Sequence, residues 1–169
     1  SFGLGIGSFL GLYGAVYHLL NHALNKGMLF LCSGVLLYSF GTPDMRRLGT
    51  RTHSRWLAVC FFVGALGIAG MPPLNGFWSK FAIYVAAGEA HLWWPLGIAL
   101  FTGLLTLAVL VRAGAWIFMQ HGHASAPEAA QEHAAPRCPA AMAAVIGLMT
   151  LLVLATGLNA GPMNRWIDA

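Results

Sequence analysis

The sequence predicts an all-α membrane protein, a polytopic bundle of about four transmembrane helices of which one is discontinuous. Of its 169 residues, 58% are hydrophobic and only 8% are charged, whereas a soluble domain carries roughly 25% charged residues. The apolar segments are long and unbroken, unlike the alternating stretches of about ten residues that form a membrane β-barrel. We therefore expect the whole chain, residues 1–169, to form a single helical membrane domain.

The first apolar segment runs from about Leu10 to Phe40, where the turn formers of residues 41–44 (GTPD) end it. About thirty residues in one helix would span ~45 Å, more than the hydrocarbon core needs. Either this helix is tilted, or its first turns belong to a tight bend near Gly11 and Gly14. The preceding residues, 1–12, contain no initiator Met and no basic region. They are therefore not expected to be a signal peptide, but the end of an earlier apolar segment.

Residues 41–55 form the one densely basic loop of the chain. Its four arginines are Arg46, Arg47, Arg51 and Arg55. Basic loops collect on the cytoplasmic side of membranes, so we expect this loop to be cytoplasmic in a multi-pass protein of a bacterial inner membrane. The net charge of +4 then concerns orientation, and no nucleic-acid partner is expected.

The second apolar segment, from Trp56 to about Gly88, is interrupted by Gly70-Met71-Pro72-Pro73. Two consecutive prolines remove two backbone donors and disfavour a helical conformation in the residue before them. Inside a bilayer such a break is tolerated only where protein or a water-filled cavity covers the freed groups. We interpret the segment as one discontinuous crossing; two short separate crossings are the alternative.

Two further spans are expected, from about Pro95 to Met119 and from about Ala140 to Leu158. Between them, residues 120–139 are rich in Ala, Pro and His without an apolar period, which is typical of a flexible loop. The connection at 89–94 contains no Lys or Arg. Four crossings place this connection outside and both other loops inside, in agreement with the charge rule.

The most informative residues are His18, His22 and Lys26, spaced at i, i+4 and i+8 in the first apolar segment. In a helix this spacing places them on nearly one face, with successive members about 6 Å apart. Asn21 and Asn25 repeat the spacing and widen the polar stripe. A lysine inside a span costs at least a few kcal/mol unless it meets water or a partner, and histidine titrates near neutral pH. The row predicts a proton relay, although hydrogen-bonded packing histidines are the alternative.

Lys80 is the second charge inside an apolar segment, and it follows the Pro-Pro break by about two helical turns. Transporters build ion sites at discontinuous helices near the middle of the bilayer. We therefore predict that Lys80 belongs to the same proton relay. The alternative is a lysine whose amine extends to the membrane interface.

Other residues carry weaker signals, and no metal or other cofactor is expected. Four residues have side chains that bind metals, but their spacing fits no standard site. They are His121, His123, His133 and Cys138. Cys32 and Cys60 lie in apolar segments, where a free cysteine behaves as a small hydrophobic residue. The glycines at 3, 7 and 11 form a GxxxGxxxG pattern that indicates close helix packing.

Three strings in order, HLLNHALNKGMLFLCSG, GTPDMRRLGT and GIAGMPPLNGFWSK, resemble the proton-conducting antiporter-like subunit family. Its members include large membrane subunits of respiratory complex I, of membrane-bound hydrogenases and of multi-subunit cation/proton antiporters. The resemblance covers about residues 13–120. It implies that His18, His22 and Lys26 match the central polar axis of the second half-channel, and that Lys80 matches the terminal lysine on the second broken helix.

Two departures from the family pattern stand out. The family's first repeat, with its glutamate–lysine pair, has no counterpart here, and a Gly-Gly after the basic loop is Gly49-Thr50. The resemblance therefore implies partners: other membrane subunits within the lipid bilayer, one of which supplies the missing N-terminal half. A truncated gene product, a split subunit and a fragment are the three explanations of the missing half that the sequence leaves open.

The function expected is that of a proton-translocating membrane subunit in a complex I-like or energy-converting hydrogenase complex. Such a chain is not catalytic alone, and the redox chemistry of an NADH:quinone oxidoreductase or hydrogenase would belong to its partners. One alternative is a cation (Na⁺)/proton antiporter subunit, and another is a structural half-subunit needed for assembly. A sodium site favours a carboxylate near the midplane; the apolar cores contain none, and Glu89 lies at a span end.

Overall fold

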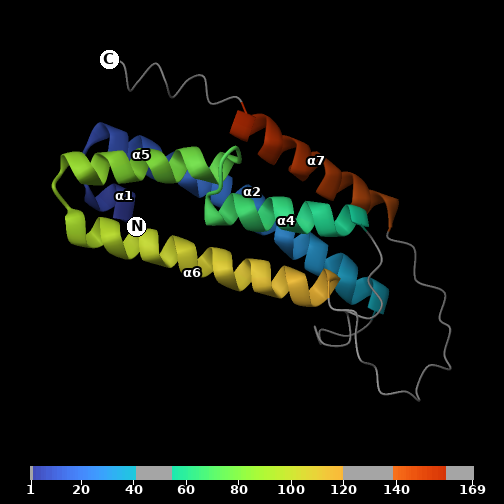
Figure 1. Ribbon diagram of the computed structural model, residues 1–169. Coiled ribbons are helices and arrows are strands. Elements are labelled where there is room, and N and C mark those ends of the chain that lie inside the picture. The colour runs from blue at the N-terminus through green and yellow to red at the C-terminus, as the bar shows by residue number, and fades with distance from the viewer. Residues whose placement is uncertain (1, 41–54, 120–138, 159–169) are drawn as a thin grey trace.

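The computed structural model describes residues 2–40, 55–119 and 139–158, which form helices and no strand (Figure 1). The all-α class is thus confirmed. The helices of these ranges are α1 (Phe2–Gly5), α2 (Phe9–Phe40), α4 (Arg55–Ala69), α5 (Asn75–Glu89), α6 (Trp93–Phe118) and α7 (Ala140–Leu158). Several predicted features fall outside the described residues. They are Arg46, Arg47, Arg51, the loop over 120–138, and the ligand candidates His121, His123, His133 and Cys138.

Helix α2 is one continuous helix of 32 residues, so a bend near Gly11 and Gly14 was the wrong alternative. The chain bends earlier, at Gly7, whose φ of 72° lies in the region that glycine adopts without steric cost. Gly7 therefore belongs to no helix, and the GxxxGxxxG pattern is not a ridge on one helix surface. The close packing it indicated is present between α1 and α2, because a Cβ at Gly11 would lie 2.9 Å from the carbonyl oxygen of Gly3.

The discontinuous helix is confirmed, with α4 ending at Ala69 and α5 beginning at Asn75. In Figure 1 the two pieces follow one another along the bundle, while α6 runs back beside both. Each piece has 15 residues, about 22 Å, which is shorter than the ~30 Å hydrocarbon core. The arrangement favours one interrupted crossing, and the total of four crossings stays a prediction.

The backbone of the break is hydrogen-bonded within the protein. The N–H groups of Gly70 and Met71 both donate to the carbonyl of Leu66, at 2.9 and 3.0 Å. From the other side, the indole of Trp78 donates to the carbonyl of Gly157 on α7, at 2.9 Å. Helix α7 therefore contacts α5 close to the break, whereas Met71, Pro72 and Pro73 within the break are exposed. In a bilayer, other protein or a water-filled cavity would have to cover these exposed residues.

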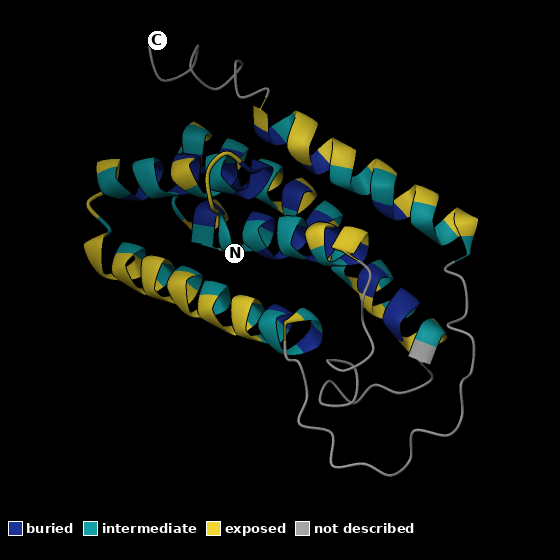
Figure 2. Cartoon of the chain, turned by 45° about the vertical axis from the view of Figure 1, so that its right-hand side comes forward, coloured by how far each residue is buried: buried dark blue, intermediate teal, exposed yellow. Residues whose placement is uncertain are grey.

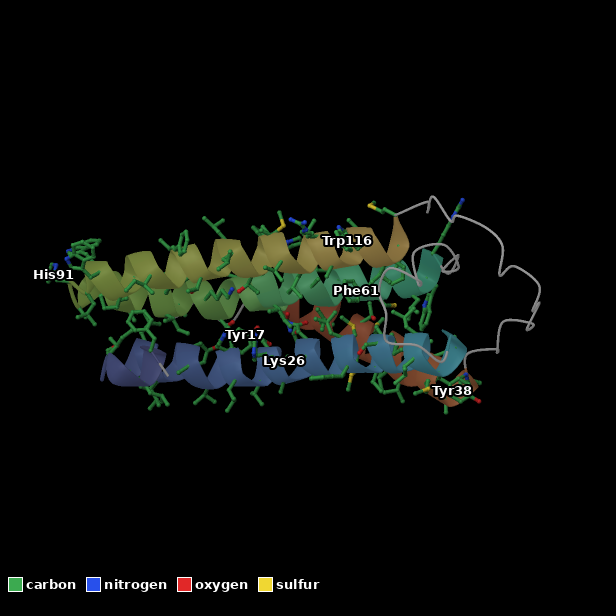
Figure 3. All side chains as sticks on the ribbon, turned by 90° about the horizontal axis from the view of Figure 1, so that it is seen from below. Tyr17, Lys26, Tyr38, Phe61, His91 and Trp116 are labelled. Atoms are coloured by element: carbon green, nitrogen blue, oxygen red, sulfur yellow. The ribbon has the colours of Figure 1, made fainter. Side chains whose placement is uncertain are left out.

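The hydrophobic core lies toward the α4 end of the bundle. It joins α2, α4, α6 and α7 and contains Phe61 (Figure 3). Cys32 and Cys60 are free and buried in this core, which confirms that they pack as small hydrophobic residues. The core fixes one end of the bundle, so the other end, around α5, is where a cavity has room to form.

Two helices carry a broad apolar surface. Both α6 and α7 are long and apolar enough to cross a membrane, and exposed residues follow their outer faces in Figure 2. Large hydrophobic side chains are prominent among them, including Trp94, Phe101 and Leu104 on α6 and Leu151 on α7. A continuous apolar face of this extent is suited to lipid or to neighbouring membrane helices.

The contact between α4 and α5 leaves no room for a side chain at Gly76. A Cβ there would overlap the carbonyl oxygen of Gly67, whereas a Cβ at Gly88 in the same helix meets no atom within 4 Å. We expect Gly76→Ala to lower the free energy of unfolding by about 1–3 kcal/mol, since overpacking forces the backbones apart. Gly88→Ala is the matched control and should leave stability nearly unchanged. Equal denaturation midpoints of the two variants in mixed detergent micelles would contradict this packing.

Candidate functional site

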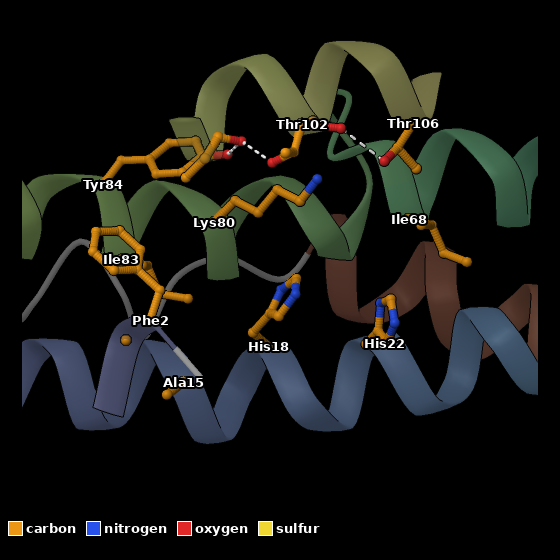
Figure 4. Close-up of a pocket in the computed structure, with 13 residues that line it drawn as sticks. Phe2, Ala15, His18, His22, Ile68, Lys80, Ile83, Tyr84, Thr102 and Thr106 are labelled. Atoms are coloured by element: carbon orange, nitrogen blue, oxygen red, sulfur yellow. Dashed lines mark hydrogen bonds between the residues drawn. The ribbon is translucent and has the colours of Figure 1, made fainter. Parts of the chain in front are cut away.

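A cavity of about 300 Å³ lies between α2, α5 and α6, and residues of α1 and α4 complete its lining (Figure 4). Three of the four predicted site residues line it: His18 and His22 from α2, and Lys80 from α5. The volume is sufficient for several water molecules, which need polar partners to remain in place. The fold therefore brings together titratable groups that are more than fifty residues apart in the sequence.

The two histidines lie one helical turn apart on α2 and point toward α5 (Figure 4). Their rings are stacked, with centroids 5.5 Å apart and planes inclined by 29°. Both side chains are partly buried. His18 and His22 thus share one face of the cavity, as their i, i+4 spacing predicts.

Lys80 lies in the second turn of α5 and reaches back across the break. Its Nζ donates to the carbonyl oxygen of Ala69, the last residue of α4, at 2.8 Å. The stem passes Gly70, where a Cβ would be only 2.8 Å from Lys80 Cδ and where φ is +86°. A side chain at position 70 would therefore obstruct the lysine. The amine is directed at the interrupted helix, which disfavours the alternative of a lysine extending to the interface.

Lys26 is not part of this cavity. It is exposed, and it does not line the space that His18 and His22 line. Each step of four residues turns the direction of a side chain by about 40°, so Lys26 is rotated by about 80° from His18. The predicted row is therefore a spiral and not a line. Lys26 lies near the middle of the bundle's length, between His91 at one end and Tyr38 at the other (Figure 3).

Three buried asparagines connect α2 to the start of α5. Asn75 Nδ2 donates to Asn21 Oδ1 at 3.2 Å, and Asn25 Nδ2 donates to Asn75 Oδ1 at 3.0 Å. Asn21 Nδ2 in turn donates to the backbone carbonyl of Asn75 at 3.0 Å. At most 2% of each residue is exposed. The sequence showed Asn21 and Asn25 as part of a polar stripe, and nothing in the spacing indicated that Asn75 would be their partner.

Ser79 forms a second connection between the same helices. Its Oγ lies 3.1 Å from His18 Nδ1 and donates to the carbonyl oxygen of Gly76, also at 3.1 Å. Ser79 is fully buried. The side of His18 that faces α5 is thus occupied by a hydroxyl group.

Sequence reasoning missed the hydroxyl groups on α6, which it treated as a uniformly apolar span. Thr102 and Thr106 both line the cavity. Thr106 Oγ1 donates to the carbonyl of Thr102 at 2.7 Å, and Thr102 Oγ1 donates to that of Ala99 at 3.0 Å. Their hydrogens are used within the helix, so the oxygens are left as acceptors. The i, i+4 pair of threonines was the available signal.

The cavity is lined by titratable side chains and by hydroxyl oxygens that can accept hydrogen bonds from water. Of the described residues that line it, none carries a carboxylate. In the described part of the chain, no group of three or more His, Cys, Asp or Glu side chains is placed to hold a metal ion. The arrangement is suited to moving protons through water between His18, His22 and Lys80.

The asparagine triad predicts an unequal response to truncation. Asn75→Ala removes two side-chain hydrogen bonds and leaves polar atoms of Asn21 and Asn25 buried without partners, at a cost of about 1–3 kcal/mol in unfolding free energy. Asn25→Ala removes one of those bonds and also removes Asn25 Oδ1, which has no partner among the described residues. Asn75→Ala should therefore lower the free energy of unfolding more than Asn25→Ala, as measured by denaturation in detergent micelles. The reverse order would show that the triad is not the connection that holds α5 to α2.

Several known proteins are similar to this chain. It is 40% identical over 118 residues to a Na(+)/H(+) antiporter subunit of Alkalihalophilus pseudofirmus, an alignment that covers 69% of this chain and 24% of that protein. It is 46% identical over 72 residues to "Hydrogenase-4 component B" of Escherichia coli, covering 42% of this chain and 11% of the relative. The chain thus spans a quarter or less of the length of these curated relatives.

A solved structure and a family model extend the comparison. The structure of the Mrp complex from Dietzia sp. matches with a TM-score of 0.80 and 25% identity, over 95% of this chain and 37% of the other. Residues 2–106, which contain the entire cavity, match the family model described as "NADH:quinone oxidoreductase/Mrp antiporter, TM". The chain belongs to this family of transmembrane subunits, as its sequence motifs predicted.

Proposed function

We propose that this chain forms part of a proton-translocating membrane subunit in a complex I-like or energy-converting hydrogenase complex. One observation carries the proposal: His18, His22 and Lys80, from helices distant in the sequence, line one cavity beside a helix break. Ionisable residues inside a membrane are costly and mark ion pathways by default. The relatives' names, among them an antiporter subunit and a hydrogenase component, support the same role.

In this proposal a proton enters the cavity through water and is held in turn by a histidine and by Lys80. A protonated Lys80 is stabilised by the carbonyl of Ala69, at the negative end of the α4 dipole. A second proton on His18 or His22 is repelled by that charge, because like charges interact strongly in a medium of low dielectric constant. Protonation of both groups at once is therefore unfavourable, so uptake of a proton by one group favours release from the other.

Lys26 is the member of the relay that faces away from this cavity. Its exposed position on α2, near mid-length of the bundle, suits a group that passes protons to or from neighbouring helices. A charge facing lipid at that depth costs at least about 2.5 kcal/mol. We therefore infer that other family helices cover Lys26, whether they belong to the same polypeptide or to a partner subunit.

The charges of the chain and its similarity to larger subunits also indicate its orientation in the membrane and its partners. We propose that it lies in a bacterial inner membrane with the 41–55 loop on the cytoplasmic side, because that loop carries four arginines. Its partners are other membrane subunits of a multi-subunit complex, including helices equivalent to the first half of its relatives.

A cation/proton antiporter subunit is the second candidate, and the similarity to the Na(+)/H(+) antiporter subunit of Alkalihalophilus pseudofirmus favours it. A sodium ion prefers oxygen ligands, and carboxylates are strong ones. Within residues 2–40, 55–119 and 139–158 the one acidic side chain is Glu89, at the end of α5 and outside the cavity. This absence from the described lining tilts the proposal toward protons.

Proton uptake into sealed vesicles that contain the complete complex tests the proposal. We expect Lys80→Ala to reduce proton translocation at least tenfold while the complex remains assembled, because the relay loses the group beside the break. Lys80→Gln keeps a donor for Ala69 but cannot carry a proton, so it should fail equally.

Arg112→Gln is the matched control, since Arg112 is a cation on α6 that packs over Trp116, 5.6 Å from the ring centroid, and does not line the cavity. It should pump normally. Full pumping by both Lys80 variants in an assembled complex would contradict the proposal and favour a structural half-subunit needed for assembly. Sodium-dependent pumping by the wild type would favour the antiporter.

A further inference from the structure

Ser79 has two hydrogen-bonding neighbours and a single hydrogen to offer them. Its Oγ lies 3.1 Å from the carbonyl oxygen of Gly76 and 3.1 Å from His18 Nδ1. The residue is 0% exposed. Water therefore does not compete for the hydroxyl, and its orientation is decided by these two neighbours.

The Gly76 carbonyl settles that orientation because a carbonyl oxygen can only accept. If the serine hydrogen turned toward His18, two oxygen acceptors would face each other in a buried site, which is unfavourable. The hydrogen therefore goes to Gly76, and a lone pair of Ser79 Oγ faces the imidazole. To complete this bond, His18 must carry a hydrogen on Nδ1.

We propose that Ser79 is a positioning residue that holds neutral His18 in the Nδ1–H tautomer and leaves Nε2 to exchange protons with the cavity. The hydrogen bond of one ring nitrogen sets the protonation of the other. The proposal deepens the proposed function and rests on it for the statement that His18 carries protons. The proposed tautomer rests only on the two hydrogen-bond contacts of Ser79.

The consequence is a restriction on the path. A proton from a cavity water binds the Nε2 lone pair and gives an imidazolium whose two nitrogens both carry hydrogen. Loss from Nδ1 has no onward acceptor, because the Ser79 hydrogen is already donated to Gly76. The proton must leave again from Nε2, which restores the original tautomer. His18 therefore returns protons to the cavity shared with His22 and Lys80, and does not pass them across its ring toward the break.

Nitrogen NMR of histidine tests this inference. We would label the complete complex with ¹⁵N-histidine, place it in lipid bilayers, and assign the His18 signals by their loss in His18→Gln. Neutral imidazole tautomers differ in their pair of ¹⁵N shifts, so the protonated nitrogen is read directly. In the wild type, the Nδ1–H pattern should dominate. In Ser79→Ala, the Nε2–H tautomer should become the major form.

Two variants serve as controls. Ser79→Thr keeps the hydroxyl and should restore the Nδ1–H pattern. Ser33→Ala removes a hydroxyl that, among the described residues, bonds to carbonyls of its own helix, those of Leu29 and Phe30, and should leave the spectrum unchanged. The wild-type spectrum needs only His18→Gln, for its assignment, so it tests the inference even if Ser79→Ala does not assemble.

An Nε2–H pattern in the wild type, or an Nδ1–H pattern that persists in Ser79→Ala, would overturn the inference. Failure of the proposed function looks different: pumping would survive Lys80→Ala while the tautomer still responded to Ser79. If both stand, Ser79→Ala should also slow pumping, and Ser79→Thr should recover it.

Discussion

A helix that stops inside a hydrocarbon layer leaves backbone groups that lipid cannot hydrogen-bond, and the rest of this bundle is arranged around that constraint. Asn75, the first residue of α5, bonds through its side chain and its backbone carbonyl to Asn21 and Asn25 on α2. Because these bonds are buried, they fix the height and rotation of α5 against α2. Lys80 and Ser79 follow on the same helix, so their positions depend on this attachment.

The break lies between two different regions, the buried asparagines that join α2 to α5 and the cavity that Lys80 lines. On one side lie the three buried asparagines, together with the partly buried indole of Trp78 that bonds to α7. On the other side, Lys80 and His18 line a space that also exposes the hydroxyl oxygens of α6. One discontinuity thus provides a carbonyl end for the ammonium group of Lys80 and a helix start at which Asn75 bonds to the buried asparagines of α2. A continuous helix would offer neither, because its carbonyls would be used internally.

The sequence predicted much of the fold and of the candidate site, and the features that it did not predict have physical reasons. Periodicity and composition predicted the helices, and Pro72-Pro73 predicted the break, because proline acts locally on the backbone. The pairing of His18 with His22 followed from helical spacing. The sequence placed Lys26 on nearly the same face as His18 and His22. In the structure, the rotation that accumulates over eight residues carries it to the exposed face. The partnership of Asn75 with α2 depends on tertiary packing, which spacing along one helix does not determine.

Water-edited NMR of the complex in lipid bilayers tests the central claim most directly, by measuring magnetisation transfer from water to assigned side-chain nitrogens. The account predicts rapid transfer to His18, His22 and Lys80, which line the cavity, and slow transfer to the amides of the asparagine triad. The two sets lie within a few turns of one another and serve as mutual controls. Equal transfer to both sets, or no transfer to Lys80, would contradict the separation of a water-accessible cavity from the buried asparagine triad.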